Sequence, residues 1–207
     1  SWCSRYHRLA ANGLDRTTCL QLFGHARIGS AHDFPGRIDA LVARSKGSLG
    51  SAEQVIRDRT LLPFYWPFKP SDLARQSVAA MRGNDIAHLK YRMGLLTSGL
   101  GAAHPLKTCP ECMQADLEGH GWAYWRRAHQ LPGVWVCPSH GMPLRVSHLK
   151  LDQVARFAWA LPVPACGQDV VFLDHAAGKF TQGGWLRRLA AEGLALVGMS
   201  PGRFADP

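Results

Sequence analysis

The chain has 207 residues, of which 46% are hydrophobic and 19% charged, as in a folded globular protein rather than a disordered tail. No apolar run reaches the roughly 18 residues that a membrane-spanning helix needs, so we expect no membrane partner. The formal net charge is +9 at pH 7, and the excess lies in residues 1–150, because five basic and five acidic residues balance in 151–207. A basic balance favours polyanions such as nucleic acid, although solvated basic faces are also common in small domains.

The first hundred residues are predicted to form short helices separated by Gly and Pro. Asp15 begins one helix, which Gly24 ends, and Pro35 can begin the next, which ends near Gly47. Ser51 caps a third helix, with Gln54 three residues later as in a capping box. Further helices are predicted to begin at Ser71 or Asp72 and at Asn84, whereas the three prolines of 61–70 indicate an extended segment.

We therefore predict a mainly α fold in three segments. Residues 1–104 form a helical N-terminal domain, residues 105–148 a zinc-binding module, and residues 149–207 a partial helical segment. The last segment contains an amphipathic helix that begins near Trp185, with an apolar face left unburied. Because the chain begins at Ser1 rather than Met, we expect it to be a fragment. We also expect it to end inside a second DNA- or partner-binding region, because the charge excess stops at about residue 150 and yet the chain continues.

Two short motifs predict a metal site. Cys109-Pro-Glu-Cys112 is followed, 24 residues later, by Cys137-Pro-Ser-His140. Two residues between ligands allow a tight turn to present both to one tetrahedral ion, and backbone N–H groups of that turn can donate to the first thiolate. Gly141 eases the exit from the second turn. Because the same unit occurs twice, we predict one structural Zn²⁺ bound by these four residues.

Other chemistries fit this spacing less well. A thioredoxin-like pair begins a helix after a strand, and no βαβ pattern is present. A catalytic zinc keeps one position open, whereas four good ligands close this site. A zinc deaminase needs H-x-E upstream of P-C-x-x-C, which is absent here. Cys166 and His175 fit no metal-binding spacing, so they predict no second site. The small number of cysteines is typical of reduced thiols, which suit a cytoplasmic protein.

The predicted module is too small to fold on apolar burial alone, so we expect a compact core around the zinc. Its candidate residues are Trp122, Tyr124, Trp125, Leu131, Val134, Trp135 and Leu144. Three thiolates and Zn²⁺ leave a formal charge of minus one, which nearby basic residues could offset. The same residues could instead form a rim that contacts phosphate or a partner. They are Lys107, Arg126, Arg127 and Arg145.

At these residues the chain resembles the TniQ family, which includes the TnsD-type target selectors of bacterial transposons. The resemblance spans roughly residues 1–147 and is strongest in three stretches of the module. They are Lys107 to Cys112, Gly121 to Val134 and Val136 to Gly141. Weaker likenesses lie upstream, at Ser1-Trp2, at Leu22-Phe23-Gly24, and from Thr60 to Tyr65 with Pro67-Phe68.

The resemblance implies a non-enzymatic adaptor that recognises a transposition target and recruits an AAA+ ATPase regulator, which then engages the transposase. The target would be DNA or a CRISPR guide-RNA effector complex, in the bacterial cytoplasm near the nucleoid. It also implies a structural role for zinc at Cys109, Cys112, Cys137 and His140. The alternatives are a protein–protein module without nucleic-acid contact and a nuclease subunit, although the scattered carboxylates argue against clustered catalytic metals.

Overall fold

The computed structural model describes residues 2–9, 14–98, 104–150, 158–162, 172–173 and 184–205. Contacts between residues group the chain into two compact units, each assembled from two stretches. The helical unit comprises residues 12–103 and 196–207, and the mixed unit comprises residues 1–11 and 104–195. The two are described separately below, and the division into segments 1–104, 105–148 and 149–207 stays a prediction.

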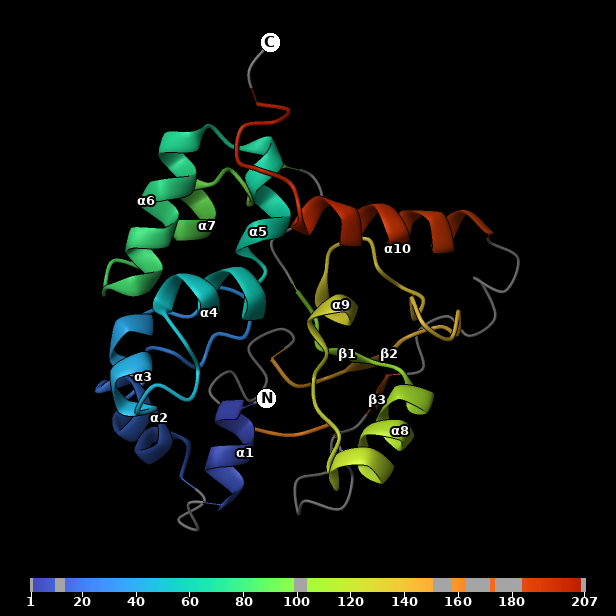
Figure 1. Cartoon of the computed structure of the whole chain (residues 1–207), viewed down its shortest axis with the longest axis horizontal. Helices are drawn as coiled ribbons and strands as arrows, with labels where there is room; N and C mark the ends of the chain where they lie inside the picture. The colour runs from blue at the N-terminus through green and yellow to red at the C-terminus, as the bar shows by residue number, and fades with distance from the viewer. Residues whose placement is uncertain are drawn as a thin grey trace. The chain divides into compact units, whose positions relative to one another are not determined.

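The helical unit packs its helices around a core in which α3 contacts three neighbours, α2, α4 and α6. Its elements are α2 (Asp15–Phe23), α3 (Ile38–Arg44), α4 (Ala52–Arg59), α5 (Leu62–Tyr65), the 3₁₀ helix η1 (Trp66–Phe68), α6 (Ser71–Arg82) and α7 (Leu89–Arg92). The deepest apolar side chains include Phe23, Ile38, Ile56, Leu62 and Met81. The predicted mainly helical character is therefore confirmed (Figure 1).

Two local end signals in this unit fall where the sequence places them. Gly24 ends α2 in the left-handed region, at φ 66°, which a residue without Cβ adopts at low cost. Ser51 and Gln54 form the predicted capping box at the start of α4, because each side chain bonds the other's backbone N–H.

Three expectations were wrong. The segment 61–70 is not extended, since Leu62–Tyr65 forms α5 and Trp66–Phe68 forms η1. A proline in the first turn of a helix loses only a donor that has no intrahelical partner, so Pro63 and Pro67 are accommodated in the first turns of these helices. Pro35 does not begin α3, and Asn84 does not cap α7, which starts at Leu89.

The mixed unit contains a small antiparallel sheet that the sequence did not predict. Its elements are α1 (Trp2–Leu9), β1 (Lys107–Thr108), α8 (Pro110–His120), α9 (Arg127–Gln130), β2 (Arg145–Ser147), β3 (Phe172–Leu173) and α10 (Gly184–Val197). The strand order is β1-β2-β3, with Lys107 opposite Val146 and Val146 opposite Leu173. Figure 1 shows α9 against β1 and α8 leaving the end of β1, which places the first cysteine pair at the sheet edge.

The core predicted for this region is partly confirmed. Leu131, Val134 and Leu144 are buried, whereas Trp122, Tyr124 and Trp125 are half-buried and Trp135 is 39% exposed. Trp125 packs on Leu106 and Leu149, and its indole N–H donates to the carbonyl of Ala160 at 2.8 Å.

The predicted amphipathic helix near Trp185 is present as α10. Its apolar stripe of Leu186, Ala190 and Gly193 is buried, so the expectation of an unburied apolar face is wrong for these residues. Trp185 and Leu189 remain 55% and 41% exposed. Within the described part of the chain, no helix is long and apolar enough to cross a membrane.

Candidate metal centre

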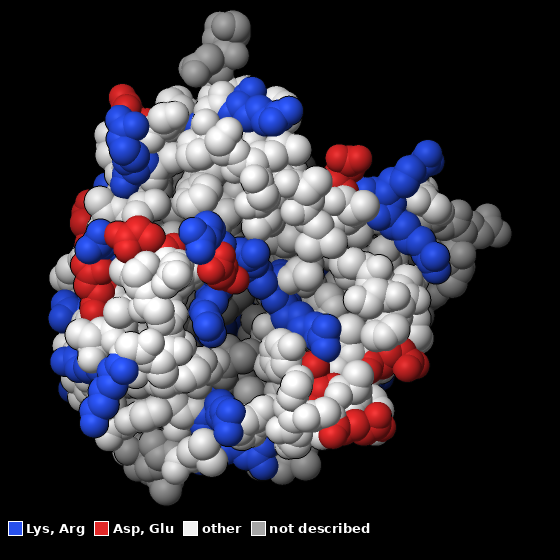
Figure 2. All heavy atoms as spheres, viewed as in Figure 1, with Lys and Arg blue, Asp and Glu red and all other residues white. Residues whose placement is uncertain are grey.

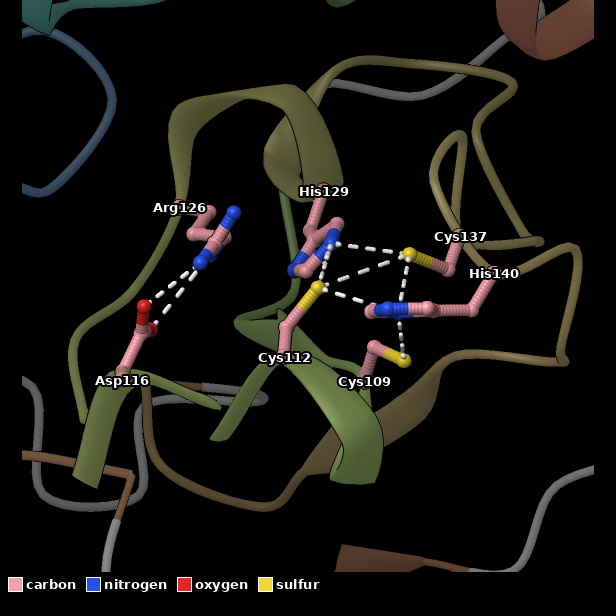
Figure 3. A network of polar contacts seen from close by, with 7 residues as sticks. All are labelled: Cys109, Cys112, Asp116, Arg126, His129, Cys137 and His140. Atoms are coloured by element: carbon pink, nitrogen blue, oxygen red, sulfur yellow. Dashed lines mark hydrogen bonds and ion pairs between the residues drawn. The ribbon is translucent and has the colours of Figure 1, made fainter. Parts of the chain in front are cut away.

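The four predicted ligands converge on one point of the mixed unit (Figure 3). The Sγ atoms of Cys109, Cys112 and Cys137 and a ring nitrogen of His140 lie within 4.8 Å of one another. The His140 Nδ1 atom lies 3.5, 3.4 and 3.6 Å from the three sulfurs in turn. The sulfurs of Cys112 and Cys137 are 3.6 Å apart.

These separations suit a tetrahedral ion. With metal–sulfur bonds of about 2.3 Å and metal–nitrogen bonds of about 2.0 to 2.1 Å, a regular tetrahedron has S···N edges of roughly 3.6 Å and S···S edges of roughly 3.8 Å. The observed S···N distances of 3.4 to 3.6 Å match the first value, and the Cys112–Cys137 distance is close to the second. The group can therefore hold a metal ion with His140 coordinating through Nδ1.

The first cysteine pair stands at the beginning of a helix. Cys109 is the N-cap of α8, Pro110 is its first residue, and Cys112 lies in its first turn. The backbone N–H groups of Cys112 and Glu111 act to lower the pKa of the Cys109 thiol, and the helix N-terminus favours negative charge there.

This placement corrects one argument drawn from the sequence. The pair does begin a helix directly after a strand, as a thioredoxin-like motif would. What distinguishes the site from a redox pair is instead that Cys137 and His140 lie close to the first cysteine pair.

The second pair is held by a tight hairpin. The N–H of Gly141 donates to the Cys137 carbonyl at 2.7 Å, and the N–H of Cys137 donates to the Met142 carbonyl at 2.7 Å. Val136 and Pro143 form an isolated bridge that closes the hairpin. Gly141 has φ 65°, a left-handed conformation that L side chains rarely adopt, so it provides the predicted exit from the turn.

Burial makes the thiols of Cys109 and Cys112 harder to ionise when no metal is bound. Burial raises the pKa of the Cys109 thiol, although the backbone N–H groups around it act in the opposite direction. Burial, and then the neighbouring Cys137 sulfur, raise the pKa of Cys112 to about 12. A cation bound among the sulfurs reverses this balance, because metal ligands must be deprotonated and binding releases their protons.

Lys107 lies inside the unit rather than on its surface. It is 2% exposed, and its Nζ donates to the carbonyls of Leu131 and Val134 at 3.1 and 2.6 Å. The same ammonium group lies 4.6 Å from the centre of the Trp135 ring. Burial lowers the pKa of Lys107 to about 7. Its Nζ therefore holds the loop before the second cysteine pair through hydrogen bonds, and in this position it does not face a phosphate outside.

Arg126 is also tied internally. It forms a bidentate ion pair with Asp116 of α8, with nitrogen–oxygen distances of 3.3 and 2.5 Å (Figure 3). The hydrogen bonds that Arg126 donates to Asp116 raise the pKa of the guanidinium, and the carboxylate itself is buried. Of the other two predicted contact residues, Arg127 is half-buried at the start of α9 and Arg145 is exposed on β2.

Two residues of α9 border the site although the motif did not select them. The Nε2 atom of His129 lies 3.8 Å from the Cys112 sulfur and 3.6 Å from the Cys137 sulfur. Burial, and then the charges of Arg126 and Lys107, lower the pKa of His129 to about 4, so its ring is neutral at pH 7.

Gln130, which follows His129, binds the backbone of the first strand. It accepts from the N–H of Lys107 at 2.7 Å and donates to its carbonyl at 2.8 Å. The one sequence signal for both residues is their place in the stretch 121–134, where the family resemblance is strong. The two remaining candidates, Cys166 and His175, lie outside the described residues.

Fold and site together define a chain in which three cysteines and one histidine, set between a short sheet and a helix, could hold a metal ion. The TniQ family model matches residues 1–144, which is more than half of the chain. The chain therefore belongs to the TniQ family.

A curated relative supports this membership. The chain is similar to the transposon Tn7 transposition protein TnsD of Escherichia coli, with 24% identity over 143 residues. The match covers 68% of this chain and 28% of that protein, so the chain corresponds to less than a third of the relative's length.

Proposed function

We propose that this chain is a zinc-stabilised adaptor in DNA transposition, which docks at the target and recruits the transposition machinery. The observation that carries the proposal is the convergence of the four ligands inside the region that matches the TniQ family. The relative named for Tn7 transposition supports the process. The AAA+ ATPase regulator is the proposed partner on the machinery side.

Zinc is the proposed metal because of the ligands and their geometry. Three thiolates and one imidazole form a soft donor set, and Zn²⁺ binds such sets tetrahedrally. One pair of ligands lies at the start of α8 and the other in the hairpin that contains Cys137, with 24 residues between the two pairs. The ion would therefore cross-link α8 and this hairpin. We infer a structural role, because binding energy at such a site is folding energy.

The proposed adaptor has no catalytic activity of its own. A zinc ion held by four protein ligands has no position left for water or substrate, which hydrolytic zinc requires. The buried carboxylate of Asp116 is bound by Arg126, and the residues that the structure describes contain no metal-binding group made of carboxylates. A nuclease subunit is therefore the weaker alternative.

The net positive charge of the chain supports direct contact with nucleic acid. The chain carries a net +9. Figure 2 shows basic side chains spread over the visible face and interspersed with acidic ones. Exposed arginines of the mixed unit include Arg145 on β2 and Arg187 and Arg188 on α10. These residues are the proposed phosphate contacts, with Arg127 at the edge of the same unit.

The test is a pull-down of the full-length protein with target DNA and the transposon ATPase, with and without an RNA-guided effector complex. Retention of DNA by the protein alone, with a steep fall in affinity as salt rises, supports direct recognition. Retention only with the effector complex supports docking on that complex. Recovery of the ATPase alone, with neither DNA nor the effector complex, indicates a protein–protein module without nucleic-acid contact. Recovery of none of these partners contradicts the proposed adaptor function.

A matched pair of variants tests the DNA contact. Arg145→Gln should weaken DNA binding and lower the salt slope by about one, as expected for one lost phosphate contact. Arg75→Gln removes an equally exposed arginine that forms an ion pair with Asp72 on α6, and should leave the slope unchanged. Equal slopes for both variants and the wild type would argue against β2 as part of the DNA surface.

A further inference from the structure

His129 faces the metal centre from a different element than any ligand. It lies on α9, is 2% exposed, and points its Nε2 atom at the sulfurs of Cys112 and Cys137 (Figure 3). The two distances, 3.6 Å to Cys137 and 3.8 Å to Cys112, fall within the range of hydrogen bonds to sulfur. His140 differs, because its Nδ1 contacts all three sulfurs and completes the tetrahedron.

The chemistry of the sulfurs decides which imidazole tautomer this geometry allows. Metal-bound cysteines are thiolates, which accept hydrogen bonds and donate none. A lone pair on Nε2 would repel them, whereas an N–H there would be attracted to both. The opposite ring nitrogen, Nδ1, is buried and has no hydrogen-bond partner among the residues that the structure describes. Only the tautomer with its proton on Nε2 can therefore donate a hydrogen bond to the sulfurs.

We propose that His129 is a positioning residue of the metal centre, which donates its Nε2 N–H to the thiolates of Cys112 and Cys137. The inference rests on the proposed zinc site. Three thiolates and one Zn²⁺ leave a net negative charge, and a hydrogen bond to the sulfurs disperses it.

The surroundings hold His129 in place. Its neighbour Gln130 bonds both the N–H and the carbonyl of Lys107, and so fixes α9 against β1. The strand β1 leads directly into Cys109, and α8 carries Cys112 in its first turn. His129 thus connects three parts of the centre: the helix α9 to which it belongs, the α8 cysteine, and the hairpin cysteine.

The proposal is tested on the full chain with two substitutions of similar length. His129→Gln keeps an N–H donor near the position of Nε2, and His129→Met has none. Each variant is loaded with Co²⁺, and the energy of the thiolate-to-cobalt charge-transfer band is measured. His129→Met should move the band to lower energy, because thiolates without the hydrogen bond give up electrons more easily, and should weaken zinc binding about tenfold in chelator competition.

His129→Gln should restore most of both quantities, which a merely space-filling role would not predict. His120→Gln, an exposed histidine at the end of α8, is the control and should behave as the wild type. An unchanged band and affinity in His129→Met would overturn the proposal. Failure of the wild type itself to bind one Co²⁺ or Zn²⁺ would instead contradict the proposed zinc site.

A measurement on the wild type needs no substitution. In the ¹⁵N-labelled, ¹¹³Cd-loaded protein, nitrogen shifts should show a proton on Nε2 of His129 and none on Nδ1. A scalar coupling between ¹¹³Cd and the Nε2 proton would report the hydrogen bond directly. A proton found on Nδ1 of His129 would overturn the proposal even if both variants failed to fold.

Discussion

Gln130 offers a sharp test of how the metal centre is supported. Its side chain, 6% exposed, accepts one hydrogen bond from the N–H of Lys107 and donates two, to the carbonyls of Lys107 and Arg126 at 2.8 and 2.9 Å. The amide thus pairs with β1 much as a neighbouring strand would, on the side that β2 leaves open. Gln130→Met keeps the length of the side chain and removes all three bonds.

The magnitude follows from the number of bonds and their burial. Three hydrogen bonds contribute about 3 kcal/mol net, and leaving the buried backbone of Lys107 unpaired adds about 1 kcal/mol or more. We expect Gln130→Met to lower the free energy of unfolding of the mixed unit by about 3 to 5 kcal/mol, a large part of a domain's usual stability. Gln114→Met is the control: its bond to Glu118 is exposed on α8, so the loss should stay below about 0.5 kcal/mol.

The assay is urea unfolding of the Co²⁺-loaded chain, followed by the thiolate-to-cobalt absorption, which reports on the mixed unit. Metal concentration is kept the same for all variants, because bound metal raises the apparent stability. Equal midpoints for Gln114→Met and Gln130→Met would refute the reasoning, since they would show that β1 is held without the Gln130 amide.

Three other outcomes are expected. Asp116→Ala should cost about 2 to 3 kcal/mol in the same unfolding assay, because it leaves Arg126 without its buried partner, whereas Asp72→Ala, which breaks an exposed pair, should cost under about 1 kcal/mol. Ser51→Ala should destabilise the helical unit by about 1 kcal/mol in thermal unfolding and leave zinc affinity unchanged, because it removes only the cap of α4. Lowering the pH should weaken zinc binding in chelator competition, since the raised thiol pKa values of Cys109 and Cys112 mean that protons compete with the metal. An affinity independent of pH between 6 and 8 would contradict raised pKa values at these two thiols.

The parts of the fold that the sequence predicts are those encoded locally. Gly24 and the Ser51–Gln54 pair act on their own helix ends, and the two C-P-x-ligand units encode their own turns. The segment 61–70 was misjudged because proline excludes a helix interior but not a first turn, and where each short helix starts depends on packing.

The environment of the site depends on contacts between distant stretches. β1 has two residues and pairs with β2 about 38 positions later, so no period-2 pattern could indicate it. Lys107 looks like a surface cation in sequence, and only the carbonyls of Leu131 and Val134 make its burial possible. His129 and Gln130 follow no ligand spacing, and their roles come from where α9 packs.

The most direct test of the account is the metal content of the purified full-length chain, measured by elemental analysis of the wild type beside Cys112→Ser. The account predicts one zinc per wild-type chain, and loss of both the zinc and the folded mixed unit in the variant, since removing one ligand of a closed site removes folding energy. A wild-type protein that is folded and holds no zinc, or a Cys112→Ser variant that keeps its fold and one zinc, would contradict it.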